Sequence, residues 1–319
     1  MSEKKIPTAS LSAQTLIDMI GISSEISVAH IENISDYVDE LRFQRLSNSS
    51  RDNLIREVLK RIELDTQIIG AAERKGVWER GWAEVLVQYD NADPTDAVEK
   101  ELIPKFFRAN QSIRLLGNYA APLVSNFESI FVSALRSVIF DHYFCDVTEF
   151  HEFGAGTGHN LVHFCKKFPQ IQAFGSDFVH SSVTLMNRLS HDLNLNLTST
   201  TFDMTRPADD YEIGEGAGVF TFGSIEQLAG KYHRFIDFIL SKKIKLCVHI
   251  EPVIELYNES LLFDWLAIKF QSKRGYTAGF LPYLQQLESS GRITLSKVKR
   301  LGFGSLMMEG YNLIVWRPV

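Results

Sequence analysis

The sequence predicts an α/β protein, in which a mostly helical N-terminal region precedes a doubly wound, mostly parallel sheet that closes with an antiparallel pair of strands. From about residue 146 onward, short β-rich runs alternate with helical runs, which is typical of right-handed βαβ units. Residues 11–90 instead carry apolar side chains at helical spacing. We therefore expect a helical domain at residues 1–118 and an α/β domain at residues 119–319.

The predicted elements follow one another in a regular order. Before residue 119, one apolar stripe at residues 54–62 and another that includes Trp78 and Trp82 indicate helices, and a further helix runs through residues 125–140. The predicted strands lie at residues 148–153, 172–178, 197–204, 217–222 and 244–251. The helices between them end near residue 167, span residues 181–193 and span residues 234–243. Two last β-rich runs, at residues 292–303 and 311–319, flank GSLMMEG and predict the antiparallel pair.

The composition argues against several classes of protein. The chain has 319 residues, 45% of them hydrophobic, and a net charge of −6, so it can bury a large core but carries no general basic surface for nucleic acid. Cys145, Cys165 and Cys247 lack the spacing of a disulfide framework or a zinc site, and we predict no metal. Without an apolar leader segment or a run of roughly 18 apolar residues, we expect a cytoplasmic protein with no membrane partner.

The most specific motif is HEFGAGTGHN at residues 151–160, between a predicted strand and a predicted helix. Glycine at every second position lets a ligand approach the main chain beside the free N–H groups of a helix N-terminus. Dinucleotide sites favour GxGxxG, whereas this run reads GxGxG. Glu152, two residues before the first glycine, suits a cationic ligand group such as an ammonium better than a pyrophosphate.

This run resembles motif I of the class I S-adenosylmethionine-dependent methyltransferases, and the resemblance extends over roughly residues 120–319. It implies a seven-stranded sheet whose last two strands form an antiparallel hairpin, S-adenosylmethionine as cofactor and S-adenosylhomocysteine as product. Asp177 occupies the place of the carboxylate that binds the ribose hydroxyls, Asp203 that of the acceptor for the adenine amino group, and Met204 lies against the ring. The implied cofactor-binding residues are Glu152, Gly154, Ala155, Gly156, Gly158, Asp177, Phe178, Asp203 and Met204.

Each of these residues also has a purely structural interpretation. The glycines can serve close packing alone, and Glu152 can pair with an arginine. Asp177 can cap the helix that begins at Ser181 or Ser182. Asp203 can simply follow a strand, where aspartate is common.

The acceptor side is expected beyond the carboxyl ends of the fourth and fifth strands, where open α/β sheets bind ligands. This places Ser224, Glu226, Gln227, His249 and Glu251 near the transfer site. His249 is the first candidate for a general base because its ordinary pKa lies near neutrality, with Glu251 on the same face of the strand and Glu226 as a further catalytic candidate. A histidine inside a strand can equally be a satisfied core residue.

Segments outside the sheet are expected to complete the acceptor pocket. In the resembled family a helical N-terminal region often covers the substrate, so residues 1–118 are interpreted as a lid or as the contact of a homodimer. Tyr119 is placed at the carboxylate end of the cofactor, with a turn at Gly117 and Asn118 as the alternative. Arg274 and Tyr276 are placed at an anionic group of the acceptor, with a solvated helix end as the alternative.

The sequence therefore predicts methyl transfer to a hydroxyl or amine of a small polar acceptor such as a sugar, an amino acid or a natural-product intermediate. The nucleobase N-methyltransferase motif of Asn or Asp before Pro-Pro is replaced by FGSIEQ, and the metal-binding aspartate of catechol enzymes by Gly223 and Ser224. A protein or peptide methyltransferase, a non-catalytic subunit that binds S-adenosylmethionine and, more distantly, an NAD-dependent oxidoreductase remain as alternatives.

Overall fold

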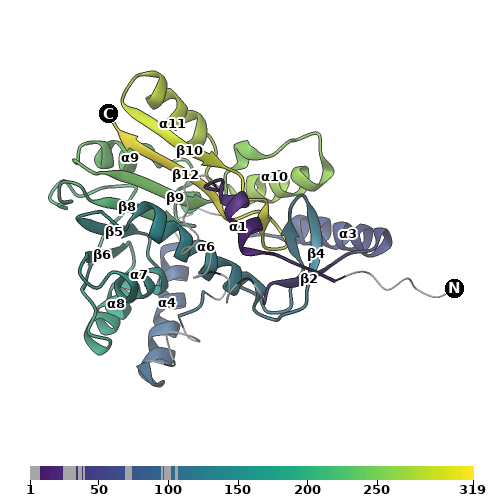
Figure 1. Ribbon diagram of the computed structural model, residues 1–319, viewed down its shortest axis with the longest axis horizontal. Coiled ribbons are helices and arrows are strands. Elements are labelled where there is room, and N and C mark those ends of the chain that lie inside the picture. Colours follow the sequence, from purple (N-terminus) through teal and green to yellow (C-terminus); the bar gives the residue numbers. More distant parts are fainter. Residues whose placement is uncertain are drawn as a thin grey trace.

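The structure, a computed structural model, describes residues 8–23, 34, 38, 40–68, 74–94, 96, 102–104 and 107–319 (Figure 1). Seven strands form the main sheet in the order β10-β12-β9-β8-β5-β6-β7. Their bounds are Glu149–Phe153 (β5), Gln172–Asp177 (β6), Leu197–Thr201 (β7), Gly218–Phe222 (β8), Leu246–Glu251 (β9), Ile293–Lys299 (β10) and Asn312–Pro318 (β12). Strands β5 to β9 are parallel, and β12 pairs antiparallel with β9 and β10, so the predicted sheet and its terminal hairpin are confirmed.

Helices cover both faces of this sheet (Figure 1). They are α6 (Phe127–Tyr143), α7 (His159–Lys167), α8 (His180–Asp192), α9 (His233–Leu240), α10 (Leu262–Arg274) and α11 (Phe280–Ser289). On one face Phe150 of β5 stacks on Phe164 of α7, with ring centroids 3.8 Å apart. On the other face α9 and α11 pack against Cys247 and Trp316. Because side chains alternate along a strand, His249 and Glu251 of β9 lie on the same face as Cys247, the face covered by α9 and α11.

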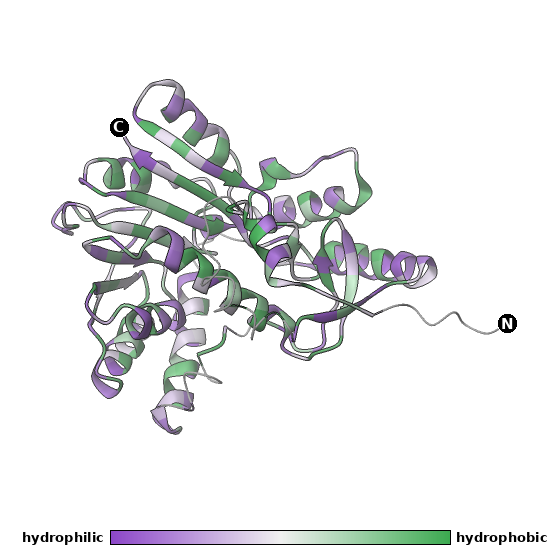
Figure 2. Ribbon diagram, viewed as in Figure 1, coloured by the Kyte–Doolittle hydropathy of each residue, from purple (hydrophilic) through white to green (hydrophobic). Residues whose placement is uncertain are grey.

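The distribution of apolar residues agrees with this arrangement of a sheet between layers of helices. Strands β9 and β12 are largely apolar and appear mostly green in Figure 2, and all six residues of β9 are buried. This burial of β9 is expected of a parallel strand that is covered on both faces. Within the described residues, no helix combines the length and the apolar character needed to cross a membrane.

A second, antiparallel sheet was not predicted. Its order is β1-β2-β4-β3-β11, with bounds Thr8–Ser10 (β1), Arg42–Arg45 (β2), Ile113–Leu115 (β3), Asn118–Pro122 (β4) and Phe303–Gly304 (β11). The N-terminal region therefore combines these strands with the helices α1 (Ala13–Ile20), α3 (Asn48–Leu64) and α4 (Arg74–Asp90). The predicted boundary between residues 118 and 119 falls inside β4, and β11 comes from the far end of the chain.

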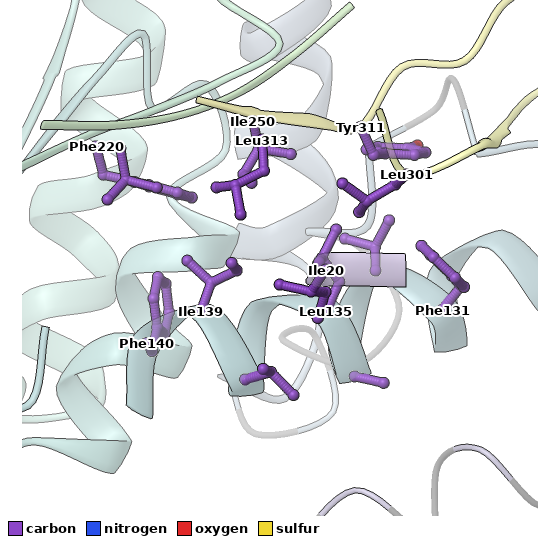
Figure 3. Packing of buried hydrophobic residues seen from close by; sticks show 14 of the residues in the cluster. Ile20, Phe131, Leu135, Ile139, Phe140, Phe220, Ile250, Leu301, Tyr311 and Leu313 are labelled. Carbon is purple, nitrogen blue, oxygen red and sulfur yellow. The ribbon is translucent and has the colours of Figure 1, made fainter. Parts of the chain in front are cut away.

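The two sheets share one core. Ile20 of α1 lies in the same buried cluster as Leu135 of α6 and Leu313 of β12 (Figure 3). The ring of Phe303 in β11 stacks on that of Phe131 in α6 at a centroid distance of 3.7 Å. Apolar side chains from the beginning, middle and end of the chain are thus buried together.

Helix α4 is attached to the main sheet through α8. The Glu79 carboxylate accepts hydrogen bonds from the backbone N–H groups of His180 (2.9 Å) and Ser181 (2.8 Å) at the start of α8. At the other end of α4, the Tyr89 hydroxyl donates to Asp192 (3.2 Å), the last residue of α8. These contacts hold α4 beside the carboxyl ends of β5 and β6, next to the glycine-rich turn.

Candidate functional site

Three positions of the turn after β5 favour glycine. Gly154, Gly156 and Gly158 have φ angles of +73°, +55° and +74°, which side chains disfavour. A Cβ atom on Gly154 would lie 2.5 Å from the Cβ of Ser224, and one on Gly158 would lie 2.9 Å from Cγ of Met186. A Cβ on Gly156 would lie 3.1 Å from the Trp82 ring of α4. The turn is therefore packed from three sides, and its main chain faces a cavity.

The Asp177 carboxylate ties the end of β6 to this turn. It is 4% exposed, accepts from the Gly156 N–H at 2.9 Å, and accepts from the Val179 N–H at 3.2 Å. Burial raises the pKa of Asp177 to about 6, which these backbone donors oppose. The first N–H groups of α8 are bound by Glu79, so Asp177 is not the cap of that helix. Its carboxylate lines the cavity instead.

Glu152 places an unpaired carboxylate oxygen at the same cavity. Its side chain is buried, and Oε1 accepts from the Asn160 side-chain N–H at 2.7 Å. Arg136 donates to Oδ1 of that asparagine at 3.1 Å, which fixes the orientation of the amide. Oε2 of Glu152 has no hydrogen-bond partner among the described residues, and burial raises the pKa of this carboxyl to about 8. A buried oxygen of this kind is suited to a cationic ligand group.

The first cavity has a volume of about 490 Å³, within the usual range of small-molecule sites. The predicted cofactor residues in its lining are Glu152, Gly154, Ala155, Gly156, Asp177, Phe178, Asp203 and Met204. Gly158 is outside the lining and packs on α8 instead. The Asp203 carboxylate accepts from the backbone N–H of Thr205 at 2.8 Å. The predicted acceptor residues Ser224 and Gln227 also line this cavity.

A second cavity of about 740 Å³ adjoins the first. Four of the predicted residues line it: Glu226, Gln227, Arg274 and Tyr276. Arg274 donates to Asp65 at 2.6 Å and to the Tyr276 hydroxyl at 3.3 Å, so part of its guanidinium is already bound within the protein. The walls common to both cavities are formed by Arg74, Trp78, Trp82, Phe222, Gly223 and Gln227.

Three of these shared residues come from α4 and were not predicted as site residues. The sequence shows Trp78 and Trp82 at helical spacing but does not indicate what that side of the helix contacts. Glu128 and Tyr311, which also line the second cavity, were missed as well. The Tyr311 hydroxyl donates to Glu128 at 2.7 Å, and burial raises the pKa of Glu128 to about 7.

Two buried carboxyls lie next to each other, Glu226 in the turn after β8 and Glu251 at the end of β9. Glu251 accepts from the backbone N–H groups of Ser224 and Ile225, both at 3.1 Å, and lines neither cavity. It therefore holds the 224–226 turn in place, which corrects its prediction as a catalytic residue. Glu226 does reach the second cavity. Burial, followed by the nearby charge of Glu251, raises the pKa of Glu226 to about 8.

The prediction of His249 as general base is wrong. The side chain is 0% exposed, lies on the face covered by α9 and α11, and lines neither cavity. The indole N–H of Trp316 donates to Nε2 at 2.9 Å, so the neutral ring carries its proton on Nδ1 and donates to the Thr221 hydroxyl at 2.8 Å. Burial lowers the pKa of His249 to about 3. His249 is therefore a core residue with both ring nitrogens hydrogen-bonded, which was the alternative interpretation of the sequence.

A His249→Gln variant tests this assignment. We expect the free energy of unfolding to fall by about 1–3 kcal/mol, because glutamine cannot bind both Trp316 and Thr221 in the ring's geometry. S-adenosylhomocysteine affinity should stay within about twofold. Urea unfolding and calorimetric titration measure the two quantities, with the exposed His191→Gln as control. Unchanged stability together with lost binding would contradict the core assignment.

The placement of Tyr119 at the cofactor is also wrong. Tyr119 belongs to β4 of the second sheet and is 1% exposed. Its hydroxyl accepts from Arg114 at 3.2 Å, and its ring meets Phe263 edge-on at a centroid distance of 5.0 Å. The strand pairing between β3 and β4 turns this side chain into a cluster with α3 and α10, away from both cavities.

Solved structures of other proteins match this chain at low sequence identity. No family model and no curated protein matches the chain. Among solved structures, geranyl diphosphate C-methyltransferase from Streptomyces coelicolor A3(2) is 13% identical, with 75% of this chain and 98% of that chain covered and a TM-score of 0.45. A SAM-dependent methyltransferase from Aquifex aeolicus is 12% identical, with 72% and 100% covered and a TM-score of 0.43. Magnesium protoporphyrin IX methyltransferase from Synechocystis PCC 6803 is 10% identical, with 59% and 82% covered and a TM-score of 0.42.

The strand order itself identifies the fold. Five parallel strands, a glycine-rich turn after the first of them and an antiparallel last strand inserted beside β9 reproduce what the resemblance implied. This chain has the class I methyltransferase fold.

Proposed function

We propose that this chain is an S-adenosylmethionine-dependent methyltransferase that binds the cofactor in the first cavity and a small-molecule acceptor in the second. The observation that carries the proposal is the free Oε2 atom of Glu152, a buried carboxylate oxygen at a glycine turn with no partner among the described residues. The ammonium of the methionine tail supplies the missing partner. The pyrophosphate of a dinucleotide carries no positive charge that could pair with this oxygen.

The remaining cofactor contacts fit the same cavity. Each Asp177 oxygen accepts one backbone N–H and retains a lone pair for a ribose hydroxyl. Met204 and Phe178 provide apolar surface for the adenine, and Asp203 an acceptor for its amino group. Because Gly154 and Gly156 have no side chains, a ligand can lie directly over the main chain of the turn.

Glu226 is the proposed general base. When bound, S-adenosylmethionine supplies an electrophilic methyl group, and the chain's own residues align the acceptor and remove its proton. Glu226 lines the second cavity, and a carboxyl with a pKa near 8 can hold a proton taken from a hydroxyl or amine. Cavities of this size favour a small acceptor over a protein, which would need an open groove.

The cofactor assignment is tested by titrating the protein with S-adenosylhomocysteine and with NAD in a calorimeter. We expect saturable binding of S-adenosylhomocysteine, weakened about tenfold or more by Asp177→Ala through loss of two hydroxyl contacts. The exposed Asp209→Ala serves as a matched control. Binding of NAD alone, or no binding of either ligand by folded protein, would refute the proposal.

A further inference from the structure

The inference concerns the chemical class of the methyl acceptor, and it rests on the function proposed above. Arg74, Trp78 and Trp82 are spaced by four residues on α4 and therefore share one side of that helix. All three line both cavities. A molecule bound in the second cavity with its reactive group near the first must pass along this side of α4.

Arg74 places a guanidinium at the junction of the two cavities. Its guanidinium lies over the Trp78 ring at 5.3 Å from the centroid, and its buried Nε has no hydrogen-bond partner among the described residues. No described carboxylate forms an ion pair with it, because Asp65 is paired with Arg274. Burial lowers the pKa of Arg74. An unpaired, half-buried guanidinium is stabilised by an anionic ligand group, and a carboxylate fits its planar fork.

The opposite wall offers acceptors that lack donors. Gln227 donates from Nε2 to Glu226 at 2.7 Å, which leaves its buried Oε1 without a partner among the described residues. Among the described residues, Glu226 itself accepts a hydrogen bond from this amide and forms no ion pair. These oxygens need a ligand that donates a hydrogen bond, and the donor group is then beside the proposed base.

Aromatic surfaces border the space between these two polar sites. The rings of Trp78 and Trp82 stack with centroids 5.5 Å apart and an interplanar angle of 25°. Phe222 and Tyr311, whose centroids are 5.7 Å apart, belong to the wall formed by the sheet. Stacking between such surfaces favours a flat ring.

We propose that the acceptor is an aromatic acid that carries a hydroxyl or amino group on its ring. The carboxylate pairs with Arg74, the ring lies along Trp78 and Trp82, and the hydroxyl or amine donates to Glu226 or Gln227. In the transfer, the bond from the sulfonium sulfur to the methyl carbon breaks as the bond from the acceptor oxygen or nitrogen to that carbon forms. The acceptor's proton passes to the Glu226 carboxylate, and the sulfur is left as a neutral thioether.

The test compares aromatic acids with their methyl esters in the presence of saturating S-adenosylhomocysteine. The probes are 4-hydroxybenzoate, 4-aminobenzoate, 4-hydroxycinnamate and 6-hydroxy-2-naphthoate, each with its ester, titrated calorimetrically. We expect at least one acid to bind at least tenfold more tightly than its ester. Arg74→Ala should remove that difference, whereas Arg80→Ala, an exposed arginine of the same helix that lines neither cavity, should keep it.

The outcomes separate this inference from the proposed function. If S-adenosylhomocysteine binds but acids and esters bind equally, or none of the probes binds, the acceptor class is wrong while the cofactor assignment stands. If Arg74→Ala weakens S-adenosylhomocysteine itself tenfold, Arg74 holds the carboxylate of the cofactor and the inference is overturned. If the wild-type protein does not bind S-adenosylhomocysteine, it is the proposed function that fails.

Discussion

Glu152→Gln is expected to weaken S-adenosylhomocysteine binding by about ten- to a hundredfold and, at pH 8, to make the ligand-free protein more stable. The loss of affinity corresponds to one charge-assisted hydrogen bond, worth about 1.5–3 kcal/mol. The gain in stability arises because glutamine keeps the contact with Asn160 but places no charge in the buried position. A residue that costs stability and is needed for binding is typical of a functional site.

The pH dependence of stability follows from the raised pKa. In the folded protein Glu152 has a pKa of about 8, against an ordinary value of 4.5, so the folded state holds an extra proton between these two values. Its contribution to stability is therefore full below about pH 4.5 and is lost as the pH rises toward 8. We expect the glutamine variant to exceed the wild type by about 1 kcal/mol or more at pH 8, and to show a smaller difference at pH 5.

Binding should also release a proton. Near pH 7 the ligand-free Glu152 is largely protonated, and pairing with an ammonium requires the carboxylate. Calorimetry in buffers of different ionisation enthalpy measures this release, which should disappear in Glu152→Gln. Glu128→Gln is the matched control, because that buried carboxyl also has a raised pKa but lines only the second cavity. Identical proton release in wild type and Glu152→Gln would contradict the assignment of Glu152 to the ammonium.

Gly154→Ala is expected to lower the free energy of unfolding by about 2–4 kcal/mol and to weaken S-adenosylhomocysteine binding more than a hundredfold. Two effects add: the φ of +73° disfavours any side chain, and the new Cβ would lie 2.5 Å from that of Ser224. Ser224 cannot move freely, since its hydroxyl donates to the Phe153 carbonyl at 3.0 Å. The turn must shift, and with it the main chain over which the ligand lies.

The Gly117→Ala variant separates the cost of backbone strain at a positive φ from the cost of the Cβ contact with Ser224. Gly117 has a φ of +80°, but a Cβ there would meet no atom within 4 Å. This variant should lose only about 1 kcal/mol of stability and no affinity. Urea unfolding and calorimetric titration provide both numbers. Equal stability losses in the two variants would mean that packing against Ser224 contributes nothing.

The sequence predicted the main sheet because short β-rich runs alternate with helical runs, and because the glycine motif has a characteristic spacing. The strands of the second sheet escaped prediction: β3 has three residues and β11 two, too short to show alternation. Tyr119 was misplaced as a consequence, since its direction is set by the pairing of β3 with β4.

For the candidate site, too, the sequence indicated some residues and missed others. The sequence indicated Glu152, within the glycine motif, and Asp177, at the end of the next strand, because local spacing fixes their positions relative to the turn. Alternation correctly placed His249 and Glu251 on one face of β9, but sequence does not indicate which helices cover that face. Arg74 and Trp78 were missed because their proximity to the cavity depends on the hydrogen bonds that join α4 to α8, far along the chain.

The short strand β11 bears on the order in which the chain folds. Leu115 of β3 pairs with Asn118 of β4 and, on its other side, with Phe303 of β11, and Ile20 of α1 lies in one buried cluster with Leu313, so contacts between segments far apart in the sequence complete the N-terminal layer. Contacts of such large sequence separation form late and slowly. Neither α1 nor β3 can make these contacts before residues 303–313 have been synthesised, and the two sheets then become stable together as one cooperative unit.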